Sequence, residues 1–143
     1  MKIILASDPA AFHEKQELVS YLQGQYEVID VGTNNSDSTH YPEWAKKLVD
    51  HVKSEHAVGI LLCGSGIGVS MVANRFAGIR AALCRDEDDA KMARLHNDAN
   101  VLCLSGRKTS MDLIKKITDT FLTTSFEGGR HQERVNQFNL LGE

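Results

Sequence analysis

The sequence lacks any apolar run long enough to span a membrane, and it lacks an excess of basic residues. It has 16 Lys and Arg residues and 19 Asp and Glu residues, so its formal net charge is -3. A membrane span needs about 20 apolar residues, and binding of nucleic acid through charge needs a basic face. Asp8 also interrupts the N-terminal apolar run too early for a signal peptide. We therefore expect a cytoplasmic protein without membrane or nucleic-acid partners.

Cysteine is scarce as well, because the chain holds only Cys63, Cys84 and Cys103 and no Cys-x-x-Cys pair. An odd number of cysteines without a secretion signal favours reduced thiols. The six histidines show no zinc-ligand spacing with the cysteines, so we expect no bound metal. Cys84 and Cys103 lie in or at the end of apolar segments, which predicts small buried side chains.

What is present is an alternation of apolar and amphipathic segments. The length of 143 residues and the 42% hydrophobic content suit one globular domain over 1–143. Apolar runs predict strands, and helical spacing predicts helices. The expected strands are 2–7, 26–31, 57–62, 79–84 and 100–104. The expected helices are 11–22, 42–52, 67–75, 86–96, 110–122 and 130–141, and a polar loop at 33–40 precedes the second of them. The pattern predicts an α/β fold, with a five-stranded parallel sheet, helices on both faces and a C-terminal helix.

The alternation also predicts where a ligand would bind. In such sheets ligands bind beyond the carboxyl ends of the strands, where the strand order reverses. If the order is 2-1-3-4-5, that point lies between the first and third strands. Asp8 follows the first strand and Cys63 ends the third, so both should face one crevice. Asp8 has two interpretations, a ligand contact or a cap of the first helix.

The most informative stretch is Cys63-Gly64-Ser65-Gly66-Ile67-Gly68, which follows a buried strand and opens a helix. Glycines let a backbone approach a ligand closely, and N–H groups at a helix start favour negative charge. A thiol at such a place can have its thiolate form favoured. A tight strand-to-helix connection without a ligand is the alternative.

Several known phosphate and nucleotide motifs do not fit this stretch. Val69 stands where a dinucleotide fingerprint needs glycine and where a cysteine phosphatase loop needs arginine. A Gly-Lys-Ser/Thr sequence is absent, so the turn is not a Walker loop. A receiver domain needs an aspartate where Cys63 stands.

Three arginines and one histidine complete the candidates. Arg130 and Arg134 are four residues apart, so they share one face of the predicted last helix. Guanidinium groups such as theirs and that of Arg107 suit a phosphate dianion, although solvated surface charges are the usual alternative. His96 and Asn97 close a predicted helix, where both residue types are ordinary.

Taken together, several stretches resemble one family. They are Asp8 after the first strand and the segments 39–42, 63–68, 78–81, 96–101 and 127–131. The chain resembles the family of ribose-5-phosphate isomerase B and galactose-6-phosphate isomerase. The resemblance implies a flavodoxin-like (Rossmann-like) fold that isomerises a phosphorylated aldose and ketose through an enediolate, without a metal or other cofactor. It also implies a homodimer or homotetramer with shared sites, and it points first to ribose 5-phosphate and the pentose phosphate pathway.

The resemblance also implies residue roles. Cys63 would be the base that moves a proton between C1 and C2, and the hydroxyl of Ser65 would make the hydrogen bond that threonine makes in many members. His96, offered from the neighbouring subunit, would help to open the sugar ring. The expected substrate contacts are Gly64, Gly66, Ile67 and Gly68 for the enediolate, Asp8, Tyr41 and Asn97 for the sugar, and Arg107, Arg130 and Arg134 for the phosphate.

One departure from the family pattern leaves the sugar open. The family usually has Asp-His-Ala-Gly near its start, whereas this chain has Asp8-Pro9-Ala10-Ala11. Pro9 offers neither a polar side chain nor an N–H group. A hexose 6-phosphate of the galactose or allose type is therefore an alternative substrate. Two further interpretations are a non-catalytic paralogue that binds a sugar phosphate and a flavin- or nucleotide-binding module on the same fold.

Overall fold

The computed structural model describes residues 1–37 and 39–142. Its strands are β1 (Lys2–Ser7), β2 (Glu27–Asp30), β3 (Val58–Cys63), β4 (Ala81–Leu83) and β5 (Val101–Ser105). Its helices are the 3-10 turn η1 (Pro9–Ala11), α1 (Phe12–Leu22), α2 (Tyr41–Glu55), α3 (Ile67–Ala73), α4 (Glu87–Leu95), α5 (Met111–Thr123) and α6 (Arg130–Phe138). The predicted strands and helices are confirmed with shifts of a few residues at their ends. Ser38 of the predicted loop 33–40 and Glu143 at the end of the predicted domain lie outside the described residues.

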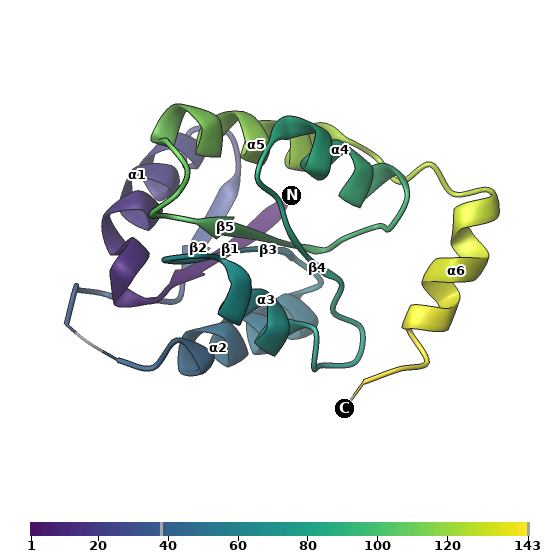
Figure 1. Ribbon diagram of the computed structural model, residues 1–143, viewed down its shortest axis with the longest axis horizontal. Helices are drawn as coiled ribbons and strands as arrows, with labels where there is room; N and C mark the ends of the chain where they lie inside the picture. The colour runs from purple at the N-terminus through teal and green to yellow at the C-terminus, as the bar shows by residue number, and fades with distance from the viewer. Residues whose placement is uncertain (38, 143) are drawn as a thin grey trace.

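The sheet is parallel and buried on both faces, as a doubly covered sheet requires. Side chains alternate between two apolar clusters: Ile60 and Leu62 face α1, α4 and α5, whereas Leu61 and Cys63 face α2 and α3. The two layers of helices lie on opposite sides of the sheet in Figure 1. Alternation along β3 therefore directs the Cys63 side chain toward the α2 and α3 layer.

The strand order differs from the expected 2-1-3-4-5. The observed order is β2-β1-β3-β5-β4, so β5 rather than β4 lies beside β3. The physical reason is burial: β4 has three residues, all half-buried, whereas all five residues of β5 are buried. A short half-buried strand suits an edge, and a fully buried strand suits the centre. The switch point remains between β1 and β3, because the chain passes from β2 across β1 to β3.

Helix α4 has an acidic first turn and a basic last turn. Asp86 caps it by accepting a hydrogen bond of 2.7 Å from the Asp89 N–H, and Arg94 lies in the last turn. Both features complement the helix dipole. The helix runs back from the carboxyl edge of the sheet, so its end brings His96 to the opposite edge.

Helix α6 stands apart from the two-layered body in Figure 1. Only His131 and Val135 of this helix are buried. The apolar residues at its end are exposed, and Leu140, with 85% exposure, has the most exposed side chain among them. The helix ends at Phe138 and not at 141 as predicted. Among the described helices, none has the length and apolar character that a membrane span requires.

Candidate functional site

A cavity of about 510 Å3 opens beyond the carboxyl ends of β1 and β3. The Asp8 N–H donates to the Leu62 carbonyl at 3.1 Å, which ties the end of β1 to the end of β3. The predicted meeting of Asp8 and Cys63 in one crevice is confirmed. The lining residues are Asp8, Ala10, Tyr41, Cys63, Gly64, Ser65, Ile67, Gly68, Met71 and Arg107.

The turn after β3 holds the thiol in a fixed position. The Gly66 N–H donates to Cys63 Sγ at 3.0 Å, and Gly66 has a φ of 77°. A Cβ at Gly66 would lie 2.6 Å from the Leu83 side chain. This glycine is therefore required both by its left-handed backbone and by the lack of space.

Tyr41 and Ser65 shape the mouth of the cavity. A Cβ at Gly68 would lie 2.6 Å from the Tyr41 ring, so the ring packs directly on the first turn of α3. The Ser65 Oγ accepts a hydrogen bond of 3.1 Å from the Ile67 N–H. The side chains of Ile67 and Met71 are exposed at this mouth, Met71 to 67%. The cavity therefore opens onto an apolar surface.

The position of β5 explains how Arg107 reaches the cavity. Ser105 pairs with Cys63 in the sheet, and the Gly106 N–H donates to the Cys63 carbonyl at 2.9 Å. The Arg107 N–H then donates to the Gly64 carbonyl at 3.1 Å. The Arg107 side chain packs against Gly64, where a Cβ would meet it at 3.3 Å. With β4 beside β3, as in the expected order, this arginine would follow a strand farther away.

Asp8 does not use its side chain as a cap. It precedes η1, but its carboxylate makes no capping hydrogen bond, and Oδ1 is buried without a partner. Burial raises the pKa of this carboxyl, while the backbone N–H groups of Ala11 and Ala10, and then the Arg107 charge, act in the opposite direction. Asp8 therefore lines the cavity with one carboxylate oxygen that has no partner among the described residues.

The remaining predicted residues lie elsewhere. His96 and Asn97 follow α4, and Arg130 and Arg134 are exposed on α6. The sheet register pairs Gly59 with Val101 and Cys63 with Ser105. Since His96 precedes Val101, it lies near the amino edge of the sheet, separated from Cys63 by about 13 Å of strand at about 3.3 Å per residue. A single chain does not bring the two predicted groups together.

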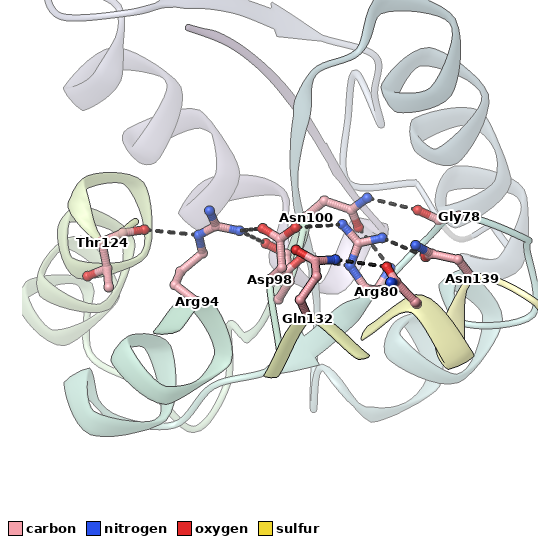
Figure 2. A network of polar contacts seen from close by, with 10 residues as sticks. Gly78, Arg80, Arg94, Asp98, Asn100, Thr124, Gln132 and Asn139 are labelled. Atoms are coloured by element: carbon pink, nitrogen blue, oxygen red, sulfur yellow. Dashed lines mark hydrogen bonds and ion pairs between the residues drawn. The ribbon is translucent and has the colours of Figure 1, made fainter. Parts of the chain in front are cut away.

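The segment after His96 is held by two arginines. Arg94 donates to Asp98 Oδ1 at 3.0 Å, and Arg80 Nε donates to the Asp98 carbonyl at 2.7 Å. Arg80 also donates to Asn139 Oδ1 at 3.0 Å, as Figure 2 shows. This network connects the end of α4, the start of β4 and the end of α6.

His131 is a residue that the sequence reasoning missed. Its ring stacks on that of His96 with centroids 4.3 Å apart, and Glu127 Oε2 lies 3.7 Å from His96 Nε2. Desolvation lowers the pKa of His131, and the neighbouring His96 and Arg130 act in the same direction. His131 belongs to the segment 127–131, which is one of the stretches that carry the family resemblance. The resemblance assigns a role to Arg130 of this segment but none to His131, so the sequence pointed to the segment and not to the residue.

Cys84 and Cys103 are both buried, which confirms the expectation for them. Burial raises the pKa of Cys84 to about 12, so it remains a neutral thiol. Neither lines the cavity that contains Cys63.

Comparison with known proteins gives consistent similarities over nearly the whole chain. A family model described as Ribose/Galactose Isomerase matches residues 3–138. Ribose-5-phosphate isomerase B of Escherichia coli (strain K12) is 44% identical over 142 residues, covering 98% of this chain and 95% of the relative. A ribose 5-phosphate isomerase structure from Thermotoga maritima has a TM-score of 0.95 and 49% identity, with 98% of each chain covered. Ribose-5-phosphate isomerase B from Mycoplasma genitalium with bound ribulose-5-phosphate has a TM-score of 0.93 and 41% identity, covering 97% of this chain and 94% of that chain.

Proposed function

The chain belongs to the Ribose/Galactose Isomerase family, and we propose that it interconverts a phosphorylated aldose and its ketose, with ribose 5-phosphate and ribulose 5-phosphate as the preferred pair. The observation that carries the proposal is the cavity at the switch point, where Cys63 and its glycine turn lie beside Asp8 and Arg107. The M. genitalium relative, whose structure holds ribulose-5-phosphate, supports this choice of sugar.

Cys63 is proposed as the base. Cys63 lines the cavity, and its Sγ accepts a hydrogen bond from the Gly66 N–H. It takes the proton from C2 of the open-chain aldose and returns it to C1, while the proton of the C2 hydroxyl passes to O1. The intermediate is an enediolate, and N–H groups of the turn from Gly64 to Gly68 would stabilise its oxygen charge. Ser65 supplies a further hydroxyl beside this turn, and the step needs no metal or other cofactor.

The phosphate and the ring-opening step are assigned to residues of two chains. His96, Asn97, Arg130 and Arg134 lie outside the Cys63 cavity of their own chain. A second copy supplies them in our proposal, with His96 helping to open the ring and the two arginines joining Arg107 at the phosphate. Charge-assisted bonds from guanidinium groups suit this dianion.

Exposed apolar surface supports a homodimer. Ile67 and Met71 are exposed beside the cavity, and Phe138, Leu140 and Leu141 are exposed at the end of α6. Apolar surface gathered at two places of a small protein is typical of an interface. Each dimer would then have two shared sites, and pairing of dimers into a tetramer is compatible with them. We further propose a cytoplasmic location and a role in pentose phosphate metabolism.

Pro9 favours a second candidate substrate. It is the first residue of η1 and provides no donor to a sugar or phosphate. A hexose 6-phosphate of the galactose or allose type therefore belongs in the test.

The test is turnover of a sugar-phosphate panel followed by NMR. The panel contains ribose 5-phosphate, allose 6-phosphate, galactose 6-phosphate and unphosphorylated ribose. Ribose 5-phosphate should react fastest, unphosphorylated ribose poorly, and Cys63→Ala should serve as the inactive control. Lack of turnover with every phosphorylated sugar would leave a non-catalytic paralogue, and a flavin spectrum in the purified protein would favour the binding module.

A further inference from the structure

We propose that His96, Glu127 and His131 form a binding site for a divalent transition-metal ion of the Zn2+ class, with a fourth coordination position open to water. One potential ligand atom from each side chain lies within 4.8 Å of the other two. This site goes beyond the proposed isomerase function, and metal binding does not depend on that function.

One pair of ligand atoms is already close to the spacing of a tetrahedral site. Zn2+ bonds to nitrogen and oxygen are about 2.0–2.1 Å long, so neighbouring ligand atoms in a tetrahedron are about 3.3 Å apart. His96 Nε2 and Glu127 Oε2 are already 3.7 Å apart. Their side chains are 39% and 58% exposed, so the His96 ring has room to turn out of its stack on His131 and Glu127 has room to follow it toward an ion.

Backbone hydrogen bonds bring the three residues together. The Glu127 N–H donates to the Leu95 carbonyl at 3.0 Å, which ties the segment after α5 to the end of α4 beside His96. The His131 N–H donates to the Gly128 carbonyl at 3.1 Å in the first turn of α6. The main chain therefore fixes the cluster, and the contact is not a chance meeting of long surface side chains.

His131 provides the independent observation that points to a ligand. This residue is only 6% exposed, and its Nε2 is buried without a hydrogen-bond partner. A buried polar atom without a partner is costly. A metal ion held by this nitrogen would satisfy it. The His96 ring, which stacks on His131 with centroids 4.3 Å apart, would have to turn out of the stack to add a second imidazole nitrogen.

The donor set selects the kind of ion. Two imidazoles and one carboxylate, with an open fourth position, form a ligand set found in zinc sites. Mg2+ and Ca2+ require six or more ligands, nearly all oxygen, and the cluster offers a single carboxylate. Imidazole ligands suit Zn2+, Co2+ and Ni2+ instead.

Binding would have a consequence for catalysis. A metal ion on His96 Nε2 withdraws that imidazole from the ring-opening role, so Zn2+ should inhibit the isomerase. This consequence, unlike the binding itself, rests on the proposed function.

The direct test is titration of the full-length protein with Zn2+ by calorimetry, and with Co2+ by its visible absorption. We expect one ion per chain and the intense spectrum of tetrahedral Co2+. Glu127→Gln and His131→Ala should each weaken binding by more than about tenfold, because loss of a mere outer-shell partner already costs about 10–100-fold. Glu127 is exposed, so its variant should fold even if the variant at buried His131 does not.

One control variant excludes a different histidine site. His51→Ala removes a half-buried histidine of α2, outside the cluster. It should leave the affinity for Zn2+ unchanged. The proposal is overturned if the wild-type protein does not bind Zn2+, if Glu127→Gln leaves the affinity unchanged, or if His51→Ala abolishes binding.

Turnover adds a second readout. Zn2+ should inhibit the wild-type protein. Glu127→Gln should need at least about tenfold more Zn2+ for the same fractional inhibition, with each rate taken relative to that protein's own metal-free rate. Equal inhibition of both proteins would contradict the site. If the protein isomerised no sugar phosphate, the binding titration would still decide the metal proposal, so the two failures are distinguishable.

Discussion

Mixing a Cys63→Ala chain with a His96→Ala chain should restore part of the activity that each variant lacks. The two residues lie at opposite edges of the sheet, because Cys63 pairs with the end of β5 and His96 precedes its start. No side-chain rotation spans that separation within one chain. A site that uses both residues must therefore take them from two chains.

The size of the recovery follows from symmetry. In a two-fold dimer each site combines Cys63 of one chain with His96 of the other, so a mixed dimer has one site with both native residues and one with neither. Equal mixing makes half of the dimers mixed, which leaves about one quarter of all sites intact. Each variant alone should be slowed by a factor of about 100 to 10,000, the usual cost of losing a positioned acid or base.

The assay is turnover of the preferred sugar phosphate after the two chains, carrying different tags, are unfolded and refolded together. Native mass spectrometry measures the fraction of mixed dimers. A parallel mixture of Cys63→Ala with Cys63→Ser chains is the control, and it should show no recovery. If mixed dimers form and the rate stays at the level of the single variants, the site is built from one chain and our reasoning is wrong.

Three further predictions test other parts of the site. Arg134→Ala should raise the KM for the phosphorylated sugar about 10- to 100-fold, since a charge-assisted bond contributes about 1.5–3 kcal/mol; equal slowing of an unphosphorylated sugar would instead assign Arg134 to the fold or the dimer. Asp8→Asn should raise the free energy of unfolding at pH 7, because burial raises the pKa of Asp8 and its ionised form is then disfavoured in the folded state. In urea titrations this gain should vanish below the unfolded-state pKa of about 3.9, where the wild-type carboxyl is protonated in both states; a gain independent of pH would contradict the cause. Dialysis against a strong chelator should not lower turnover, and a loss restored by one divalent ion would show that catalysis needs a metal.

The elements of this fold could be predicted from the sequence because each has a local signal. The apolar run from Ile60 to Cys63 marks a strand, and the glycines that follow mark a turn and a helix start. Neither signal depends on the rest of the chain. The order of the strands has no such signal. It depends on which strand is fully buried, and the difference between three half-buried residues in β4 and five buried ones in β5 arises only from tertiary packing.

The candidate site also has one part that could be predicted from the sequence and one part that could not. Asp8 and Cys63 could be placed together because residues after parallel strands meet at one edge, and the structure confirms their shared cavity. The contact of His96 with Glu127 and His131 could not be predicted from spacing. It arises where the segment after α5 bonds to the end of α4, and a sequence separation of more than 30 residues does not indicate such a contact.

The proposed division of the site between two chains also bears on inheritance. If sites are shared in this way, two genes that each encode one defect, at Cys63 or at His96, would complement each other in a cell. A single gene that encodes both defects would act dominantly instead, because in the proposed dimer its product would inactivate both sites of every dimer that it forms with a normal chain. At equal expression only the normal homodimers, about a quarter of the total, would remain active. Two defects encoded by the same gene copy would thus inhibit the normal chain, whereas the same two defects on different gene copies would complement each other.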